Sequence, residues 1–104
     1  MARFDVYAHP AAAMRKFTPF LLDVQNDFIA GLDSRVVIPL RAAALYRTRL
    51  RDLNPAFEVD SKEVVLDTAA IAAFPARELV KRVASLEGQR EEIVAAMDCL
   101  FGAY

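Results

Sequence analysis

Hydrophobic and polar residues alternate along the first part of the chain in the manner of β-strands. The pattern starts at residues 4–8 and returns at residues 17–25. The second segment places on one face Phe20, Leu22 and Val24. Residues 35–40 are rich in β-branched side chains and predict a buried strand that ends near Pro39. The first 40 residues therefore predict three strands.

The middle of the chain contains one clear element and two weaker ones. Residues 57–66 predict a β-hairpin whose turn lies at residues 60–62. Its inward face is predicted to comprise Phe57, Val59, Val64 and Leu66. Residues 42–50 predict a short helix. The Asn54-Pro55 pair follows it and separates it from the hairpin. Residues 69–74 fit a strand or a helix equally well, because alanine favours the helix.

The last 20 residues predict an amphipathic helix. Ser85 is a suitable N-cap, and Gly102 is a suitable stop signal. Between them an apolar stripe is formed by Ile93, Met97 and Leu100. Antiparallel strands followed by one helix predict a single α+β domain, mainly β, that covers residues 1–104.

Composition narrows the functional classes. The chain has 104 residues, 56% of them hydrophobic, and a formal net charge of -1. A protein that binds nucleic acid through its phosphates usually has a basic excess, so direct binding to DNA or RNA is not expected. No apolar run is long enough to cross a membrane, and no signal-peptide pattern is found near Met1. The single cysteine, Cys99, cannot form an intrachain disulfide, which suits the cytoplasm.

One short motif suggests an enzyme. Residues 21–28, Leu-Leu-Asp-Val-Gln-Asn-Asp-Phe, resemble the opening strand of isochorismatase and nicotinamidase hydrolases. That resemblance implies a catalytic role for Asp23 and makes Cys99 the nucleophile. However, those enzymes have a parallel α/β fold, and their cysteine opens a helix, whereas Cys99 is predicted near a helix end beside Asp98. We therefore interpret the match as coincidental and expect neither catalysis nor a metal or cofactor.

Three other blocks keep the same order and spacing as one known family. They are residues 3–7, residues 20–27 with residues 36–40, and residues 85–101. The most specific part is Val24-Gln25-Asn26-Asp27 followed by Val-Ile-Pro-Leu at residues 37–40. In these blocks the chain resembles toxins of the CcdB type over nearly its whole length, although residues 50–83 match loosely.

The resemblance implies a fold, a mode of action and partners. The expected fold is an SH3-like antiparallel barrel-type sheet with a small second sheet and a C-terminal helix. The expected protein is a cytoplasmic homodimer that binds the A subunit of DNA gyrase and traps the enzyme on cleaved DNA. A small antitoxin of the CcdA type would neutralise it, and the toxin would meet operator DNA only through that complex.

Gyrase-contact positions are carried over from the family one at a time. The C-terminal positions are Asp98, Phe101, Gly102, Ala103 and Tyr104, and the others are Phe4, Asn26, Phe28 and Ile29. The best-known members end in Phe-Trp-Gly-Ile, whereas this chain ends in Phe-Gly-Ala-Tyr and has no tryptophan. Tryptophan and tyrosine are both enriched among interface anchors, so Tyr104 is the expected substitute.

Two alternatives to gyrase inhibition remain open. A weakened toxin that lost its target would survive as an antitoxin-binding co-repressor. An mRNA endonuclease of the same fold would need a cationic groove for RNA, which the near-neutral net charge disfavours. A small basic cluster, Arg47, Arg49 and Arg51, is positioned in sequence to meet an acidic antitoxin tail.

Overall fold

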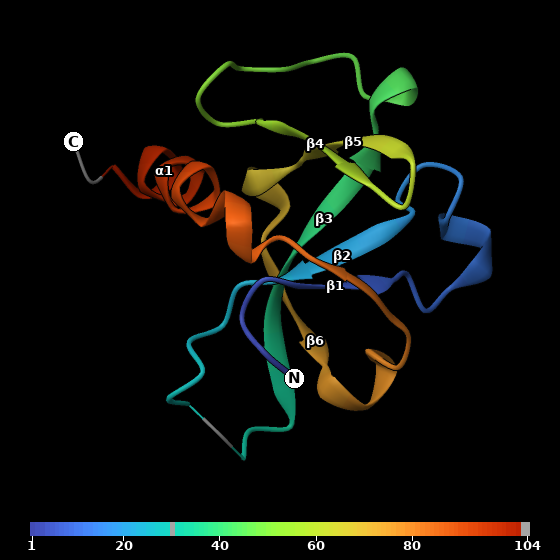
Figure 1. Cartoon of the computed structure of the whole chain (residues 1–104), viewed down its shortest axis with the longest axis vertical. Coiled ribbons are helices and arrows are strands. Elements are labelled where there is room, and N and C mark those ends of the chain that lie inside the picture. The colour runs from blue at the N-terminus through green and yellow to red at the C-terminus, as the bar shows by residue number, and fades with distance from the viewer. Residues whose placement is uncertain (30, 103–104) are drawn as a thin grey trace.

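Strand β3, Ser34–Ala42, organises the sheet because three other strands pair with it. The chain is described here by a computed structural model that covers residues 1–29 and 31–102. The other strands are β1 Asp5–Ala8, β2 Phe20–Asp23, β4 Ala56–Val59, β5 Lys62–Leu66, β6 Ala72–Pro75 and β7 Arg82–Ser85. They form one curled sheet in the order β4-β5-β3-β2-β1-β7, with β6 paired to β3 alone, and every pair is antiparallel (Figure 1).

The pairing explains why β3 does not end at Pro39, as the sequence predicted. One edge of β3 pairs with β2. The other edge pairs with β6 as far as Val37 and with β5 from Leu40 onwards. Pro39 lies in the gap between those two partners, where its missing N–H group breaks no ladder bond. The strand therefore continues to Ala42.

A single helix, α1 Arg90–Phe101, covers one face of the sheet. Ile93 and Ala96 of α1 are buried in the main core. The strands contribute to that core Val6, Phe20, Leu22, Ile38, Leu40, Phe57, Val59, Val64 and Leu66. A smaller cluster on Tyr7, Leu21, Val37 and Leu79 is separate from it. The predicted inward faces of the second strand and of the hairpin are confirmed.

The helix predicted over residues 42–50 is wrong. Only Ala43–Leu45 form a single 3₁₀ turn, η2. The side chain of Asn54 holds the following segment in an irregular path, because its Oδ1 accepts a bond from Leu50 N (2.9 Å) and its Nδ2 donates to Leu66 O (2.9 Å). Tertiary hydrogen bonds therefore override the local preference for helix.

Two further segments differ from the sequence prediction. Residues 69–74 divide between a 3₁₀ turn, η3 Thr68–Ala70, and β6. Ser85 does not cap α1, because it ends β7, an edge strand that the hydrophobic pattern did not predict. Its Oγ accepts a bond from Glu87 N at 3.2 Å, and a 3₁₀ turn, η5 Glu87–Gln89, precedes the helix. Two further 3₁₀ turns are η1 Ala12–Met14 and η4 Ala76–Glu78.

The mainly β, α+β fold class is confirmed. The expected small second sheet does not stand apart, because β4 and β5 extend the main sheet through β3. Across the described residues, no helix has the length and apolar character that a membrane crossing requires.

Candidate functional site

The base of the β2–β3 loop is a buried polar network. Asp23 is fully buried, and its Oδ2 lies 2.8 Å from Arg35 Nε and 2.7 Å from Arg35 Nη2. Its Oδ1 accepts a bond from Gln25 N at 3.0 Å. Burial raises the pKa of the Asp23 carboxyl group, although the Arg35 hydrogen bond acts in the opposite direction. Gln25 Oε1 accepts a bond from Val36 N across the loop at 3.0 Å, so both ends of the loop are fixed.

The tip of the same loop exposes large apolar side chains. Phe28 has 97% of its surface exposed, and Ile29 and Leu32 are also exposed. Asn26 shapes this tip, because its Oδ1 accepts a bond from Phe28 N (2.9 Å) and its backbone oxygen accepts one from Ile29 N (3.1 Å). The aromatic ring of Phe28 is thus presented on an ordered turn rather than packed against the protein.

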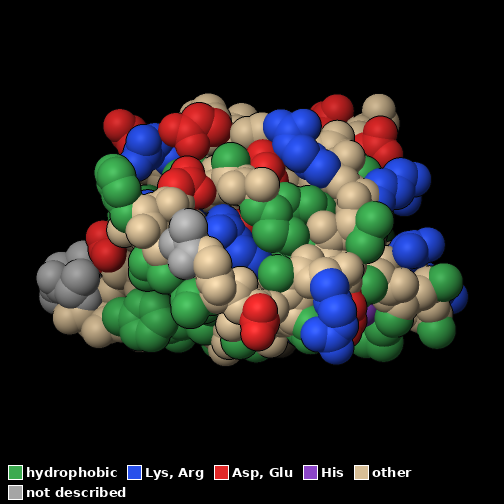
Figure 2. Space-filling view, turned by 90° about the horizontal axis from the view of Figure 1, so that it is seen from below, with side chains coloured by type: hydrophobic (Ala, Val, Ile, Leu, Met, Phe, Trp, Pro, Cys, Tyr) green, Lys and Arg blue, Asp and Glu red, His purple; other side chains and the backbone are tan. Residues whose placement is uncertain are grey.

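A second apolar position is the end of α1. Phe101 is 67% exposed at the last residue of the helix, and Asp98 is half-buried one turn earlier. Gly102 ends the helix in the left-handed conformation with φ of 74°, and its N–H donates to Asp98 O. The helix end and the β2–β3 loop lie on the same side of the molecule, the left side of Figure 1. Viewed from below, that side shows a gathering of hydrophobic side chains (Figure 2).

Phe4, which the family resemblance places among the gyrase contacts, does not present its side chain at the surface. The side chain is only 1% exposed and belongs to the main core. Its φ of 74° lies in the left-handed region, which costs a bulky residue about 1–3 kcal/mol. The Phe4 ring therefore lies in the core rather than on the surface. Ala103 and Tyr104, the other expected contacts at the C-terminus, lie outside the described residues.

The hydrolase interpretation finds no support in the geometry. Asp23 has no exposed oxygen with which to meet a substrate, and both of its oxygens are engaged by neighbouring donors. Cys99 lies two residues before the end of α1, whereas the cysteine of those enzymes opens a helix. The paired strands are all antiparallel, unlike the parallel sheet of those enzymes.

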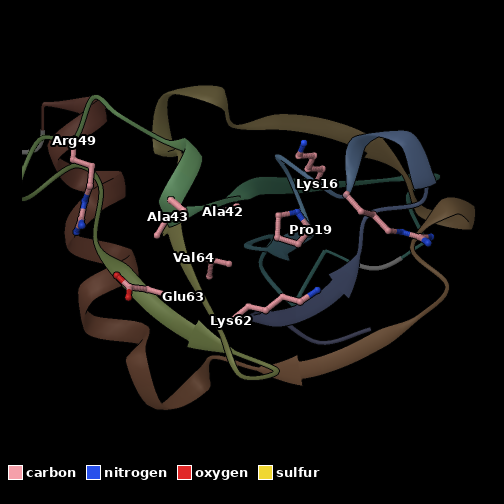
Figure 3. A pocket seen from close by; sticks show the side chains of 10 residues that line it. Lys16, Pro19, Ala42, Ala43, Arg49, Lys62, Glu63 and Val64 are labelled. Atoms are coloured by element: carbon pink, nitrogen blue, oxygen red, sulfur yellow. The ribbon is translucent and has the colours of Figure 1, made fainter.

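A further feature is a basic pocket of about 660 Å³ (Figure 3). It is enclosed by the segment before β2, by the residues around η2 and by strand β5. Its charged lining consists of Arg15, Lys16, Arg49, Lys62 and Glu63, around an apolar floor that includes Pro19, Ala42, Ala43 and Val64. Among the described residues, none of the four cations forms an ion pair with a carboxylate.

The structure divides the predicted basic cluster. Arg49 lines the basic pocket, and Arg51 lines two smaller hollows beside α1. Arg47 is exposed and lines none of the three. Sequence reasoning missed Lys62 and the adjacent pair Arg15-Lys16. The pair was visible as two consecutive cations, but nothing in the sequence placed it beside the distant hairpin.

A metal centre is not formed within residues 1–29 and 31–102, where no three His, Cys, Asp or Glu side chains group closely enough to hold an ion. The candidate site therefore has two parts. One is the exposed apolar surface of the β2–β3 loop and the end of α1, and the other is the basic pocket.

Comparison with known families gives one match. The profile described as CcdB protein covers residues 3–102, which is nearly the whole chain.

Proposed function

The chain belongs to the CcdB family of toxins from type II toxin–antitoxin systems, and we propose that it acts by binding the A subunit of DNA gyrase and inhibiting the enzyme. The observation that carries the proposal is the exposure of Phe28 on the β2–β3 loop and of Phe101 at the end of α1. These two segments lie on the same side of the molecule. Aromatic side chains are enriched at protein interfaces, and a monomer rarely exposes a large contiguous apolar patch unless the patch meets a partner.

The composition of this surface fits a specific interface. Phe28, Ile29 and Phe101 supply apolar contact area, and Asn26 and Asp98 supply polar groups around it. Apolar anchors with a polar rim are the usual arrangement at protein–protein interfaces. Anchors of this kind each contribute about 2 kcal/mol or more to binding.

We further propose that the toxin acts as a homodimer and without catalysis. Two copies would present two such surfaces to the A subunits of gyrase, which themselves form a dimer. A second copy would also cover part of the exposed apolar area around α1, where Met97 is half-buried. Light scattering at micromolar concentration is expected to give about twice 11.6 kDa, whereas a monomer mass would contradict the dimer.

Neutralisation by an antitoxin is the remaining part of the proposal. The basic pocket offers four cations above an apolar floor, a chemistry that suits an acidic segment with apolar side chains. A disordered antitoxin tail that folds on binding would cover a large part of such a surface with a short segment. Gyrase and the antitoxin are cytoplasmic, so the proposed place of action is the cytoplasm.

The test is a titration of the purified chain against the gyrase A-subunit fragment that contains the breakage domain. The wild-type chain is expected to bind, and Phe101→Ala is expected to weaken binding at least tenfold, about 1.4 kcal/mol. Val80→Ala is the matched control, because Val80 is also a large exposed apolar residue (81%) but lies between β6 and β7. Equal binding by Phe101→Ala and the control would contradict the proposal.

The absent tryptophan favours one alternative, a relic that binds only the antitoxin and acts as a co-repressor. A folded wild-type chain that binds an acidic antitoxin but not the gyrase fragment would favour this relic. Reversing charge in the basic pocket with Arg15→Glu and Arg49→Glu is expected to weaken antitoxin binding under either hypothesis and to leave gyrase binding unchanged.

A further inference from the structure

The proposed gyrase surface is carried by two separate elements, the β2–β3 loop and α1, and the backbone of Phe4 joins them. Phe4 N donates a hydrogen bond to Asp23 O at 2.6 Å, at the residue where β2 ends and the loop begins. Phe4 O accepts one from Leu86 N at 2.9 Å, directly before the turn that leads into α1. One residue thus contacts the start of both elements.

Arg3 holds the first half of the loop. Its backbone N–H donates to Asp27 Oδ1 at 2.8 Å, and its Nε donates to Val24 O at 3.1 Å. Asp27 lies directly before Phe28, and its Oδ1 is also 3.7 Å from Nη2 of Arg35. The most exposed aromatic residue of the loop is therefore one peptide unit away from a carboxylate that Arg3 fixes.

The ring of Phe4 brings Arg3 and the helix together. The guanidinium carbon of Arg3 lies 4.8 Å from the centre of that ring, and the guanidinium carbon of Arg90 lies 5.7 Å from it. Arg90 is the first residue of α1. Both distances fall within the range of a cation–π interaction. The Phe4 ring itself is buried, and the Phe4 backbone is left-handed with φ of 74°.

We propose that Arg3 is a positioning residue for the partner surface. Its side chain acts through Phe4 and Val24, and its backbone N–H acts through Asp27. Arg3→Ala removes the two side-chain contacts and keeps the backbone one. Together these contacts hold the β2–β3 loop in a fixed relation to α1, so that Phe28 and Phe101 meet the same partner together. A surface that is already ordered loses less conformational entropy when it binds, which strengthens binding without a new contact. This inference rests on the proposed gyrase function, but its effect on the loop is measurable without gyrase.

The experiment compares Arg3→Ala with the wild-type chain in two measurements. In the gyrase-fragment titration, Arg3→Ala is expected to weaken binding at least fivefold at an almost unchanged melting temperature. In amide hydrogen exchange, the N–H groups of Phe28 and Ile29 are expected to exchange at least severalfold faster, because the Asn26 turn that protects them is less firmly held. Arg3→Lys keeps a cation near the ring but loses the Nε donor to Val24, so an intermediate result is expected in both measurements.

The controls separate positioning from general damage. Arg77→Ala removes an exposed arginine in η4, away from the loop, and is expected to change neither measurement. If Arg3→Ala fails to fold, Asp27→Ala replaces it, because this change removes the acceptor of the Arg3 N–H. Asp27→Asn, which keeps an acceptor oxygen there, is the matched control and is expected to retain most of the protection.

Each outcome decides the question. If the wild-type chain binds the gyrase fragment, and Arg3→Ala binds equally well and exchanges at the same rate, the positioning role is overturned and the proposed function stands. No binding by the wild-type chain contradicts the proposed function, and the exchange measurement then decides the role of Arg3: unchanged exchange at Phe28 and Ile29 overturns it, and faster exchange supports it.

Discussion

The β4–β5 hairpin and the β2–β3 loop join antiparallel strands in opposite ways. In the hairpin, apolar side chains such as Phe57 and Val64 are buried, and the two-residue turn, Asp60 and Ser61, is polar and exposed. In the loop, the buried groups at the base are charged, Asp23 and Arg35, and the exposed tip is apolar. The hairpin has the arrangement that folding alone favours. The loop reverses it, which is expected where a segment is shaped for a partner.

The two connections also differ in what supports them. The hairpin is held by hydrophobic contacts with the main core. The loop is held by directional hydrogen bonds from Asp23, Gln25 and Asn26, so its shape is fixed although its tip contacts little of the protein. A change in the hairpin should therefore affect folding, and a change at the loop tip should affect binding.

The largest expected effect is on the hairpin. Phe57→Ala removes a buried aromatic ring and is expected to lower the free energy of unfolding by about 3–5 kcal/mol. Urea denaturation measures this loss, and gyrase binding per folded molecule is expected to stay the same. A loss below about 1 kcal/mol would mean that the hairpin does not depend on its apolar face.

The base of the loop should be almost as important for stability. Asp23→Ala leaves Arg35 buried without its main counter-charge and is expected to lower the free energy of unfolding by about 3 kcal/mol. The value is at the lower end of the usual range because Asp27 remains 3.7 Å from Arg35. Urea denaturation of Asp23→Ala and of Asp27→Ala, measured in parallel, compares the two losses of stability. If both variants lost the same stability, the buried pair would have no special role.

The tip of the loop should behave in the opposite way. Phe28→Ala is expected to change the free energy of unfolding by less than about 0.5 kcal/mol, because the ring is 97% exposed. It is expected to weaken gyrase-fragment binding by about 2 kcal/mol, roughly 30-fold. Both quantities are measured on the same variant. If Phe28→Ala lost stability but kept its binding to the gyrase fragment, Phe28 would pack against the protein rather than against a partner.

The smallest effect concerns the hairpin turn. Asp60 and Ser61 both have positive φ, 52° and 63°, as a two-residue hairpin turn requires. Ser61→Gly places glycine where that conformation costs it little and is expected to raise the free energy of unfolding by about 0.5–1 kcal/mol. Thermal unfolding measures the change, and a lower melting temperature would argue against the assigned turn.

The hairpin and the loop also show what the sequence was able to predict. Alternation placed Phe57, Val59, Val64 and Leu66 on one face correctly, because strand period and burial follow directly from the order of residues. Family resemblance indicated Phe28 and Ile29 as surface positions, and both are exposed. The resemblance assigned Phe4 to the partner surface, but its ring is buried in the main core. That placement depends on tertiary structure, including the backbone hydrogen bonds of Phe4 with Asp23 and Leu86, which a local sequence pattern does not reveal.

The net charge did not reveal how charges are distributed over the surface, because that distribution also depends on tertiary structure. The formal total of -1 conceals a pocket with four cations and a helix whose first turn carries Glu91 and Glu92. Only folding separates these charges in space. The strand β7 was missed because its exposed and half-buried residues show no clear alternation, and pairing with β1 defines it instead.

The most direct test of the account uses purified gyrase, supercoiled plasmid and the intact chain. Gyrase trapped on cleaved DNA releases linear plasmid when the reaction is stopped with detergent and protease. The wild-type chain is expected to make linear plasmid accumulate. Phe28→Ala is expected to lower the amount strongly, and Val80→Ala to leave it unchanged. If a folded wild-type chain produced no linear plasmid and left gyrase supercoiling unaffected, the central claim would be contradicted.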